Sequence, residues 1–414
     1  MNLKVGIIGA GFNANFHRLA LQSVRGAEIT GVFAVAGAEA FAAEVESNGL
    51  GECSVCESVS ELCQISDIVC MFMPNFARVE TMEEITQAVQ KGENLKGVIC
   101  EKPLGSNMKE ARRLVELANS VGLNTAYFEN QIHMPAIHSA LTQLTPTQKK
   151  MGPVTLTRSA EEHGGPHEGW FWDPTRQGGG VLCDMGCHSI AVGWYCLNPI
   201  GKSPTFMRPK SVNCSLGLLK WGLPYWREKL LKDRGVDYAK TPAEDYCSGT
   251  IVFENPETGQ IAQAQFTDSW MFEKQGLRLL MEAMGPGYAL EVNSLISPLS
   301  IFIGDAAAEA TANAEAALEK ATASRGLLAV QPNEPDLYGY VSEWRNALSA
   351  FSEGKNAFLD WEYGLEITRL VMASYVSAEC GKVINLADPL VLQVLENFVP
   401  LIQQGRGNEL FHVA

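Results

Sequence analysis

Few side chains in this 414-residue sequence stand where they could move protons or stabilise charge, and the first is Lys102. It follows an apolar run at 98–100 and precedes Pro103, whose ring restricts its own φ and keeps Lys102 out of the helical region. Open α/β sheets bind ligands at the carboxyl ends of their strands, and an ammonium fixed there can stabilise an oxygen that gains negative charge. The alternative is a surface lysine at a strand end.

Asp184 and His188 form the second candidate group. They stand four residues apart in a helical stretch that begins after three glycines, 178–180, so we expect them to share one face. A carboxylate so placed can orient an imidazole for general-base work near neutral pH, or the two can form a purely structural pair. Cys183 and Cys187 lie in the neighbouring row, but contiguous ligands on one helix rarely close a tetrahedral site, so we predict no metal.

A loop rich in glycine and proline follows an alternating strand at 154–160 and forms the third candidate group. It carries two histidines and two tryptophans, namely His163, His167, Trp170 and Trp172. Flat rings beside hydrogen-bonding groups suit a sugar, whose C–H faces stack while its hydroxyls are bonded. The loop therefore supplies candidate substrate contacts. The alternative is that the tryptophans are core anchors that pin a long loop.

These groups depend on the elements that position them, and the clearest element is the glycine turn near the amino terminus. Gly9, Gly11 and Ala14 follow a buried-strand pattern at 4–8 and open an amphipathic helix. Gly9 permits the tight turn, Gly11 lets a pyrophosphate approach the backbone, and Ala14 keeps the helix close to the sheet. The next strand, at 28–35, ends without an acid or a cation. The lack of a cation for a 2′-phosphate favours NAD slightly and leaves NADP open.

Strands and helices alternate through the first 129 residues, which predicts βαβ units and a doubly wound parallel sheet. Further strands are expected at 249–253, 261–267 and 277–283. Residues 305–324 are rich in alanine and glutamate and predict a solvated helix. The segment 389–414 has an apolar face and predicts a helical tail.

Composition narrows the class of protein. A hydrophobic content of 46% allows a large core, and the net charge of −15 argues against nucleic-acid and anionic-membrane partners. No run reaches transmembrane length, and residues 1–30 lack a signal-peptide pattern. The eleven cysteines lie mostly inside apolar patterns, which predicts reduced thiols and a cytoplasmic location.

Four motifs taken together resemble the Gfo/Idh/MocA oxidoreductase family, of the glucose-fructose oxidoreductase and inositol dehydrogenase type: 9–14, 74–75, 101–103 and 178–188. Over residues 1–390 the resemblance implies a Rossmann domain (1–129), an α+β domain with a large, mostly antiparallel sheet (130–388) and a tail (389–414). It also implies a homo-oligomer, dimer or tetramer, formed through the open face of that sheet. The motifs and the resemblance together predict as cofactor-binding residues Gly9, Gly11, Phe12, Asn13, Ala14, Pro74, Asn75, Glu101 and Lys102. In two departures, Arg78 stands where members often have histidine, and Ala34 where an acid often meets the ribose.

The function expected from residues and resemblance is hydride transfer between NAD(P) and a secondary hydroxyl of a sugar, polyol or glycoside. His188 would take the hydroxyl proton, Lys102 would bind that oxygen at the cleft between the domains, and Asp184 would hold His188 and a substrate hydroxyl. One alternative is an NAD-assisted enzyme that cleaves glycosides through transient sugar oxidation. Another is a regulatory dinucleotide-binding protein without catalysis.

Overall fold

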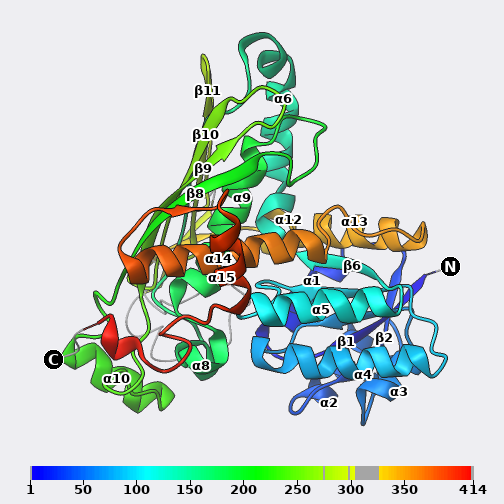
Figure 1. Cartoon of the computed structure of the whole chain (residues 1–414). Coiled ribbons are helices and arrows are strands. Elements are labelled where there is room, and N and C mark those ends of the chain that lie inside the picture. The colour runs from blue at the N-terminus through cyan, green and yellow to red at the C-terminus, as the bar shows by residue number, and fades with distance from the viewer. Residues whose placement is uncertain (1, 274–275, 297–298, 304–325, 412–414) are drawn as a thin grey trace. The chain divides into compact units, whose positions relative to one another are not determined.

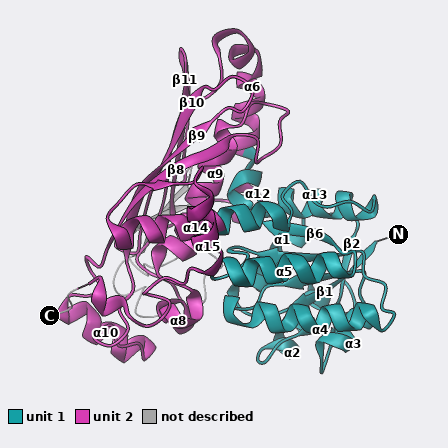
Figure 2. Ribbon diagram, viewed as in Figure 1, with its two compact units in different colours: residues 1–135, 338–368 teal, residues 136–337, 369–414 magenta. Residues whose placement is uncertain are grey.

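The computed structural model describes residues 2–273, 276–296, 299–303 and 326–411. The chain forms two compact units, one of residues 1–135 with 338–368 and one of residues 136–337 with 369–414 (Figure 2). The helix expected at 305–324 lies outside the described residues. Within the described ranges, no helix has the length and apolar character needed to cross a membrane.

Unit 1 contains a six-stranded sheet in which every neighbouring pair is parallel, in the order β3-β2-β1-β4-β5-β6 (Figure 1). Its strands are β1 (Leu3–Ile8), β2 (Ala27–Phe33), β3 (Ser54–Val55), β4 (Ile68–Met71), β5 (Gly97–Glu101) and β6 (Asn124–Phe128). β4 and β5 are buried along their whole length, as continuous apolar strands in a parallel sheet must be. The doubly wound sheet predicted for this part of the chain is confirmed.

Two helices of unit 1, α3 (Val59–Gln64) and α5 (Met108–Ser120), begin at a residue whose side chain caps the first turn. At α5, the Asn107 side chain accepts the Glu110 N–H at 3.1 Å, and the Glu110 carboxylate accepts the Ser106 N–H at 3.0 Å. α4 and α5 pack side by side, and α1 packs against α13. The helices and 3₁₀ turns described in this unit are α1 (Phe12–Leu21), α2 (Ala38–Ser47), α3 (Val59–Gln64), η1 (Asn75–Ala77), α4 (Arg78–Gln90), α5 (Met108–Ser120), η2 (Asn130–His133) and α13 (Tyr340–Ser352).

Residues 338–368 return to unit 1, whereas the sequence analysis assigned them to the second domain. The Phe351 ring lies against β5 at Gly97, where an added Cβ would be 2.7 Å from the ring. Farther along, the carbonyl of Leu359 accepts the Tyr127 N–H at 2.8 Å, which adds backbone pairing beyond the edge strand β6. These contacts join positions more than 200 residues apart, so a local sequence pattern gives no sign of them.

Unit 2 contains a seven-stranded sheet in the order β12-β11-β7-β10-β9-β8-β15. β7 and β10 run parallel and the other neighbouring pairs are antiparallel, so the mostly antiparallel sheet is confirmed. Its strands are β7 (Leu156–Glu162), β8 (Arg208–Gly217), β9 (Tyr246–Glu254), β10 (Ile261–Ser269), β11 (Arg278–Gly285), β12 (Tyr288–Asn293) and β15 (Ile384–Asn385). β13 (Leu299–Ile303) and β14 (Gly326–Val330) pair separately.

One helix, α9, packs on the face of this sheet over β7 and β10. Close approach is possible because Gly193 faces the strands, and its carbonyl accepts the Thr157 hydroxyl at 3.2 Å. In the tail, Leu395 is fully buried and Val394 is exposed. The helical segments described for unit 2 are α6 (Pro135–Met151), α7 (Gly169–Trp172), α8 (Pro174–Gln177), η3 (Leu182–Gly186), α9 (Cys187–Leu197), α10 (Pro224–Arg234), α12 (Glu334–Leu337), α14 (Trp361–Cys380), which begins in unit 1, α15 (Pro389–Asn397) and η4 (Gly407–Glu409).

Candidate functional site

The glycine turn after β1 has one glycine that the fold needs and one that leaves room for a ligand. Gly9 has φ +111°, and an added Cβ would lie 3.1 Å from the backbone of Phe72. Gly11 has an ordinary φ of −78°, and a Cβ there would meet none of the described atoms within 4 Å. The open space at Gly11 is where a pyrophosphate would approach the start of α1.

The first turn of α1 is held in shape by its own side chains. The Asn15 amide donates to the carbonyls of Ala10 and Gly11, both at 3.1 Å. Ala14 is 1% exposed, and the fingerprint requires a small buried residue at this position. The buried Oδ1 of Asn13 has no hydrogen-bond partner among the described residues. Free backbone N–H groups at a helix start, together with this oxygen, fit a dinucleotide.

The end of β2, where the adenine ribose is expected, offers little to recognise it. Val35 is fully exposed, and residues 33–37 contain neither an acid nor a cation. The neighbouring turn after β4 buries Asn75 and leaves Pro74 half-buried. The local chemistry therefore does not distinguish NAD from NADP.

Lys102 is half-buried at the carboxyl end of β5, and its backbone is held from one side by Arg78. The Arg78 guanidinium donates to the carbonyl of Lys102 at 3.3 Å and also to that of Pro103. Arg78 is 3% exposed, so this is an interior contact. The residue that departs from the family pattern thus stabilises the backbone around the candidate lysine.

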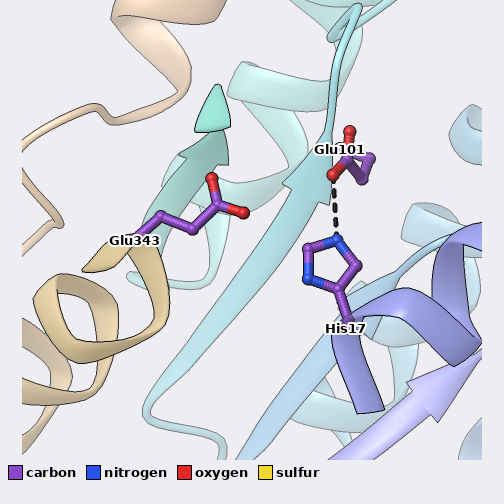
Figure 3. A group of neighbouring side chains, drawn as sticks. All are labelled: His17, Glu101 and Glu343. Carbon is purple, nitrogen blue, oxygen red and sulfur yellow. Dashed lines mark hydrogen bonds and ion pairs between the residues drawn. The ribbon is translucent and has the colours of Figure 1, made fainter. Parts of the chain in front are cut away.

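Glu101 holds the same backbone from the other side. One carboxylate oxygen accepts the Lys102 N–H at 3.0 Å, and the other accepts from His17 Nε2 at 2.9 Å (Figure 3). Both side chains are buried, and burial lowers the pKa of His17 although the Glu101 carboxylate opposes that shift. Glu101 was predicted to bind cofactor; the structure shows it bonded to the backbone of Lys102 and to His17.

In unit 2, the three glycines at 178–180 allow the chain to pass close to Glu244. A Cβ on Gly180 would lie 2.1 Å from the Glu244 carbonyl oxygen. The Glu244 carboxylate accepts the N–H groups of Gly180 and Leu182 at 2.9 and 3.1 Å, and the Tyr375 hydroxyl at 2.6 Å. The start of the helical segment that carries Asp184 is therefore fixed by one fully buried acid.

The prediction of a regular helix through Asp184 and His188 is wrong for the first turn. Asp184 lies in η3, a π-helical turn, and His188 is the second residue of α9; both are 4% exposed. Wide turns of this kind occur often at functional sites. The next residue, Ser189, donates to Asp268 at 2.6 Å, which ties the start of α9 to β10.

The neighbouring thiols are bonded to the backbone. Cys183 Sγ lies 3.5 Å from the carbonyl of Gln177, and Cys187 Sγ lies 3.4 Å from that of Asp184. A thiol that donates its proton to a carbonyl is not placed as a metal-binding thiolate. Both thiols are thus engaged with main-chain carbonyls, and the absence of a metal at this turn stays a prediction.

The aromatic loop divides into anchors and accessible side chains. Trp172 is 2% exposed, donates to the Pro166 carbonyl at 3.1 Å and packs edge-on against Trp221 at 4.5 Å. His163 is fully buried, and its Nδ1 accepts the Gly165 N–H at 2.9 Å. Trp172 and His163 were predicted to contact substrate, but their burial and hydrogen bonds are those of residues that anchor the loop in the core.

His167 and Trp170 lie on the same loop and remain partly exposed. Trp170 stacks on Phe171 with ring centroids 3.8 Å apart. A partly exposed indole and a partly exposed imidazole on one loop fit the sugar-binding role that the sequence suggested.

Several supporting residues were missed by the sequence analysis, among them His17, Trp344, Glu244, Asp268 and Tyr375. His17 comes three residues after Ala14 as a polar residue inside an otherwise buried helix face, a signal that could have identified it. The other four have no motif around them. The hydrogen bonds that involve them in this site mostly join positions 62 or more residues apart along the chain.

Two family models match the chain in the order of its units. Residues 3–127 match an oxidoreductase family with an NAD-binding Rossmann fold, and residues 147–282 match the GFO/IDH/MocA C-terminal domain. The chain belongs to the Gfo/Idh/MocA oxidoreductase family. The resemblance stated from the motifs is confirmed.

Curated relatives of this family member share about a quarter to a third of the aligned residues. Glucose-6-phosphate 3-dehydrogenase of Bacillus subtilis (strain 168) is 28% identical over 203 residues, 46% of this chain and 53% of the relative. 1,5-Anhydro-D-fructose reductase of Ensifer adhaerens is 26% identical over 194 residues, 47% and 56% respectively. The chain thus spans about half the length of the curated relatives it matches.

Solved structures share the fold over nearly the whole chain. GenD2 from gentamicin A biosynthesis, in complex with NAD, has a TM-score of 0.69 at 20% identity and covers 93% of this chain and 96% of its own. Levoglucosan dehydrogenase, in complex with NADH and L-sorbose, has a TM-score of 0.66 at 17% identity, with 93% and 99% covered. At these identities the likeness is one of fold.

Gly11→Val should abolish dinucleotide binding while the protein still folds. The added side chain meets no described protein atom at its Cβ, but it occupies the approach of a pyrophosphate to the backbone. Calorimetric titration with NAD and NADP measures the loss, and circular dichroism checks the fold. A folded variant with parental affinity would remove the cofactor from this turn.

Stability of unit 2 should fall as pH rises from 5 to 8. Burial raises the pKa of Glu244 from 4.5 to about 7 and that of Asp268 from 3.8 to about 8. The folded protein therefore holds each of these protons more tightly than the unfolded chain does. This stabilisation is fully present below the unfolded-state pKa and is lost as pH rises through the folded-state pKa. For Glu244 the loss is up to about 3 kcal/mol.

Glu244→Gln should remove the Glu244 part of this dependence and leave the part from Asp268, because an amide does not titrate. Glu228→Gln, at an exposed position of α10, is the matched control and should keep the parental slope. Denaturant unfolding at each pH gives the free energies. A parent protein equally stable at pH 5 and pH 8 would contradict the assignment.

Proposed function

We propose that this protein is a nicotinamide-dependent dehydrogenase that transfers hydride between NAD(P) and a secondary hydroxyl of a sugar, polyol or glycoside. The observation that carries the proposal lies in unit 1. The open glycine turn after β1 and Lys102 at the end of β5 share the carboxyl edge of one parallel sheet, where such folds bind dinucleotides. A cytoplasmic location and a homo-oligomeric state stay predictions.

The dinucleotide would be held by the turn 9–14 and the residues around Pro74, Asn75 and Lys102. When bound, the nicotinamide accepts or donates the hydride. Lys102 would hydrogen-bond the substrate oxygen and stabilise its charge as the proton leaves. Because Arg78 and Glu101 fix the backbone on both sides, the ammonium starts from a defined position.

In unit 2, His188 would take the proton from the substrate hydroxyl. Asp184 would orient His188 and bind a second substrate hydroxyl. Asp184 lies in η3, whose first residue bonds to Glu244, and His188 lies at the start of α9, where Ser189 bonds to Asp268. His167 and Trp170 would contact the sugar, while Trp172 and His163 keep their loop in place.

The names of the relatives support a carbohydrate as substrate. The B. subtilis relative is named for oxidation at a sugar carbon, and an E. coli (strain K12) relative, 31% identical over 161 residues, is named D-glucoside 3-dehydrogenase. That alignment covers 38% of this chain and 42% of the relative, so the particular sugar is left to experiment.

A cofactor-reduction screen tests the proposal. Purified protein is incubated with NAD or NADP and a panel of sugars, polyols, sugar phosphates and glycosides, and absorbance of the reduced nicotinamide is followed. Reduction with at least one substrate is expected. Glycoside cleavage without net reduction would favour the alternative enzyme, and nucleotide binding without turnover would favour a regulatory protein.

Lys102→Met should lower kcat by roughly 100-fold or more with nucleotide affinity near the parental value, because charge on the oxygen develops only in the transition state. Lys109→Met, at an exposed position of α5, is the control and should keep the parental kcat and nucleotide affinity.

His188→Ala should lower kcat by a similar factor and remove the acidic limb of the pH–rate profile, which reports proton loss from the base. Near-full turnover in either site variant would overturn the assigned roles.

A further inference from the structure

We propose that His17 and Trp344 are positioning residues for Lys102 and act through the carboxylate of Glu101. This inference rests on the role proposed for Lys102. It concerns residues of unit 1 alone and reaches the lysine through the hydrogen bond from the Lys102 N–H to Glu101.

The hydrogen bonds form an unbroken chain with one direction. Trp344 Nε1–H donates to His17 Nδ1 at 3.0 Å. An indole nitrogen only donates, so His17 Nδ1 must be unprotonated and the ring proton sits on Nε2. That proton is donated to one Glu101 oxygen at 2.9 Å, and the other oxygen accepts the Lys102 N–H at 3.0 Å. The indole thus fixes the tautomer that Glu101 needs.

Packing leaves the His17 ring little freedom to rotate. It is fully buried and stacks on Phe72 with centroids 4.0 Å apart and ring planes 10° apart. Trp344 is also fully buried and meets the edges of His17 and Phe128. A rigid donor at each step keeps the Glu101 carboxylate in one orientation.

Glu343 completes the group and at first suggests a metal site. It extends from α13 toward His17 and Glu101, and possible ligand atoms of the three residues lie within 4.8 Å of one another (Figure 3). Both nitrogens of His17 are already engaged, one as acceptor and one as donor, so a metal bond would require an imidazolate. The geometry favours hydrogen bonding over metal binding.

Burial shifts the titration of both neighbours of Glu101 toward their uncharged forms. Burial, followed by the nearby carboxylates of Glu101 and Glu129, raises the pKa of Glu343 well above its usual range. Burial also lowers the pKa of His17, in the same sense as the hydrogen bond that its unprotonated Nδ1 accepts from Trp344. A carboxylate in a dry environment is a strong acceptor for the Lys102 N–H.

The functional consequence follows from the cost of small displacements. If Glu101 loses its donor from His17, the carboxylate can turn and release the Lys102 N–H. Arg78 then still binds the Lys102 carbonyl, whereas the hydrogen bond from the Lys102 backbone N–H to Glu101 is lost. A shift of about 1 Å in a catalytic group can cost on the order of 100-fold in rate.

Trp344→Phe tests the chain with little change in packing, since it removes the N–H donor and keeps a large ring. Trp361→Phe is the matched control. Trp361 is equally buried in unit 1, and its Nε1 donates to the Ala126 carbonyl at 3.1 Å, away from Glu101. Three quantities are measured: amide hydrogen exchange of Lys102 by NMR, NAD affinity, and kcat and KM with the best substrate of the screen.

Trp344→Phe should speed exchange of the Lys102 amide and lower kcat by about tenfold, the effect of one hydrogen bond. KM and NAD affinity should stay within about twofold of the parent, and the primary deuterium isotope effect on kcat should rise as hydride transfer becomes slower. Trp361→Phe should change none of these. His17→Gln should behave like Trp344→Phe, and the double variant should be no worse than either single one.

Parental exchange of the Lys102 amide in Trp344→Phe would overturn the inference, as would equal loss of kcat in Trp361→Phe. The exchange measurement needs no turnover. If the parent protein reduces no cofactor and Trp344→Phe still speeds exchange, the proposed function fails and the hydrogen-bond chain stands. Faster exchange with unchanged kcat in an active enzyme would contradict the positioning role itself.

Discussion

A buried carboxylate that accepts backbone N–H groups is the interaction on which both halves of the candidate site depend. In unit 1, Glu101 accepts one hydrogen bond from the backbone N–H of Lys102 and another from Nε2 of His17. In unit 2, Glu244 accepts two N–H groups at the start of η3 and the hydroxyl of Tyr375. Removing a carboxylate from water is costly, and it is tolerated only where several donors replace the lost water.

The two carboxylates meet this cost in different electrostatic surroundings. Glu101 accepts hydrogen bonds from the Lys102 backbone N–H and from His17, and the Arg78 guanidinium donates to the next two carbonyls of the chain. The described donors to Glu244 are two backbone N–H groups and a tyrosine hydroxyl, all neutral, and burial raises its pKa to about 7. The unit 2 carboxylate therefore takes up a proton near neutrality.

The parts that sequence predicted are those in which the signal is local. The turn at Gly9 and Gly11, the strand before Lys102 and the apolar face of α5 each depend on residues within about one helical turn or one strand. The parallel sheet follows from their alternation. Period and spacing were therefore sufficient for the parallel sheet of unit 1, whereas the mostly antiparallel sheet of unit 2 was expected from the family resemblance.

What sequence did not reveal are contacts between distant segments. Trp344 lies 327 residues from His17, and Tyr375 lies 131 residues from Glu244. The return of α13 to unit 1 belongs to the same class. Local periodicity shows which face of α13 is apolar, but it cannot say which of two cores receives that face.

The aromatic loop shows why substrate identity is harder to derive than the fold. Trp172 and Trp170 look alike in sequence, yet one is an anchor packed on Trp221 and the other remains partly exposed. The buried indole of Trp172 leaves no room for a side chain at position 165, because a Cβ on Gly165 would lie 2.5 Å from the ring. The anchor thus fixes the loop backbone, and the choice of sugar falls to the accessible side chains that this backbone presents.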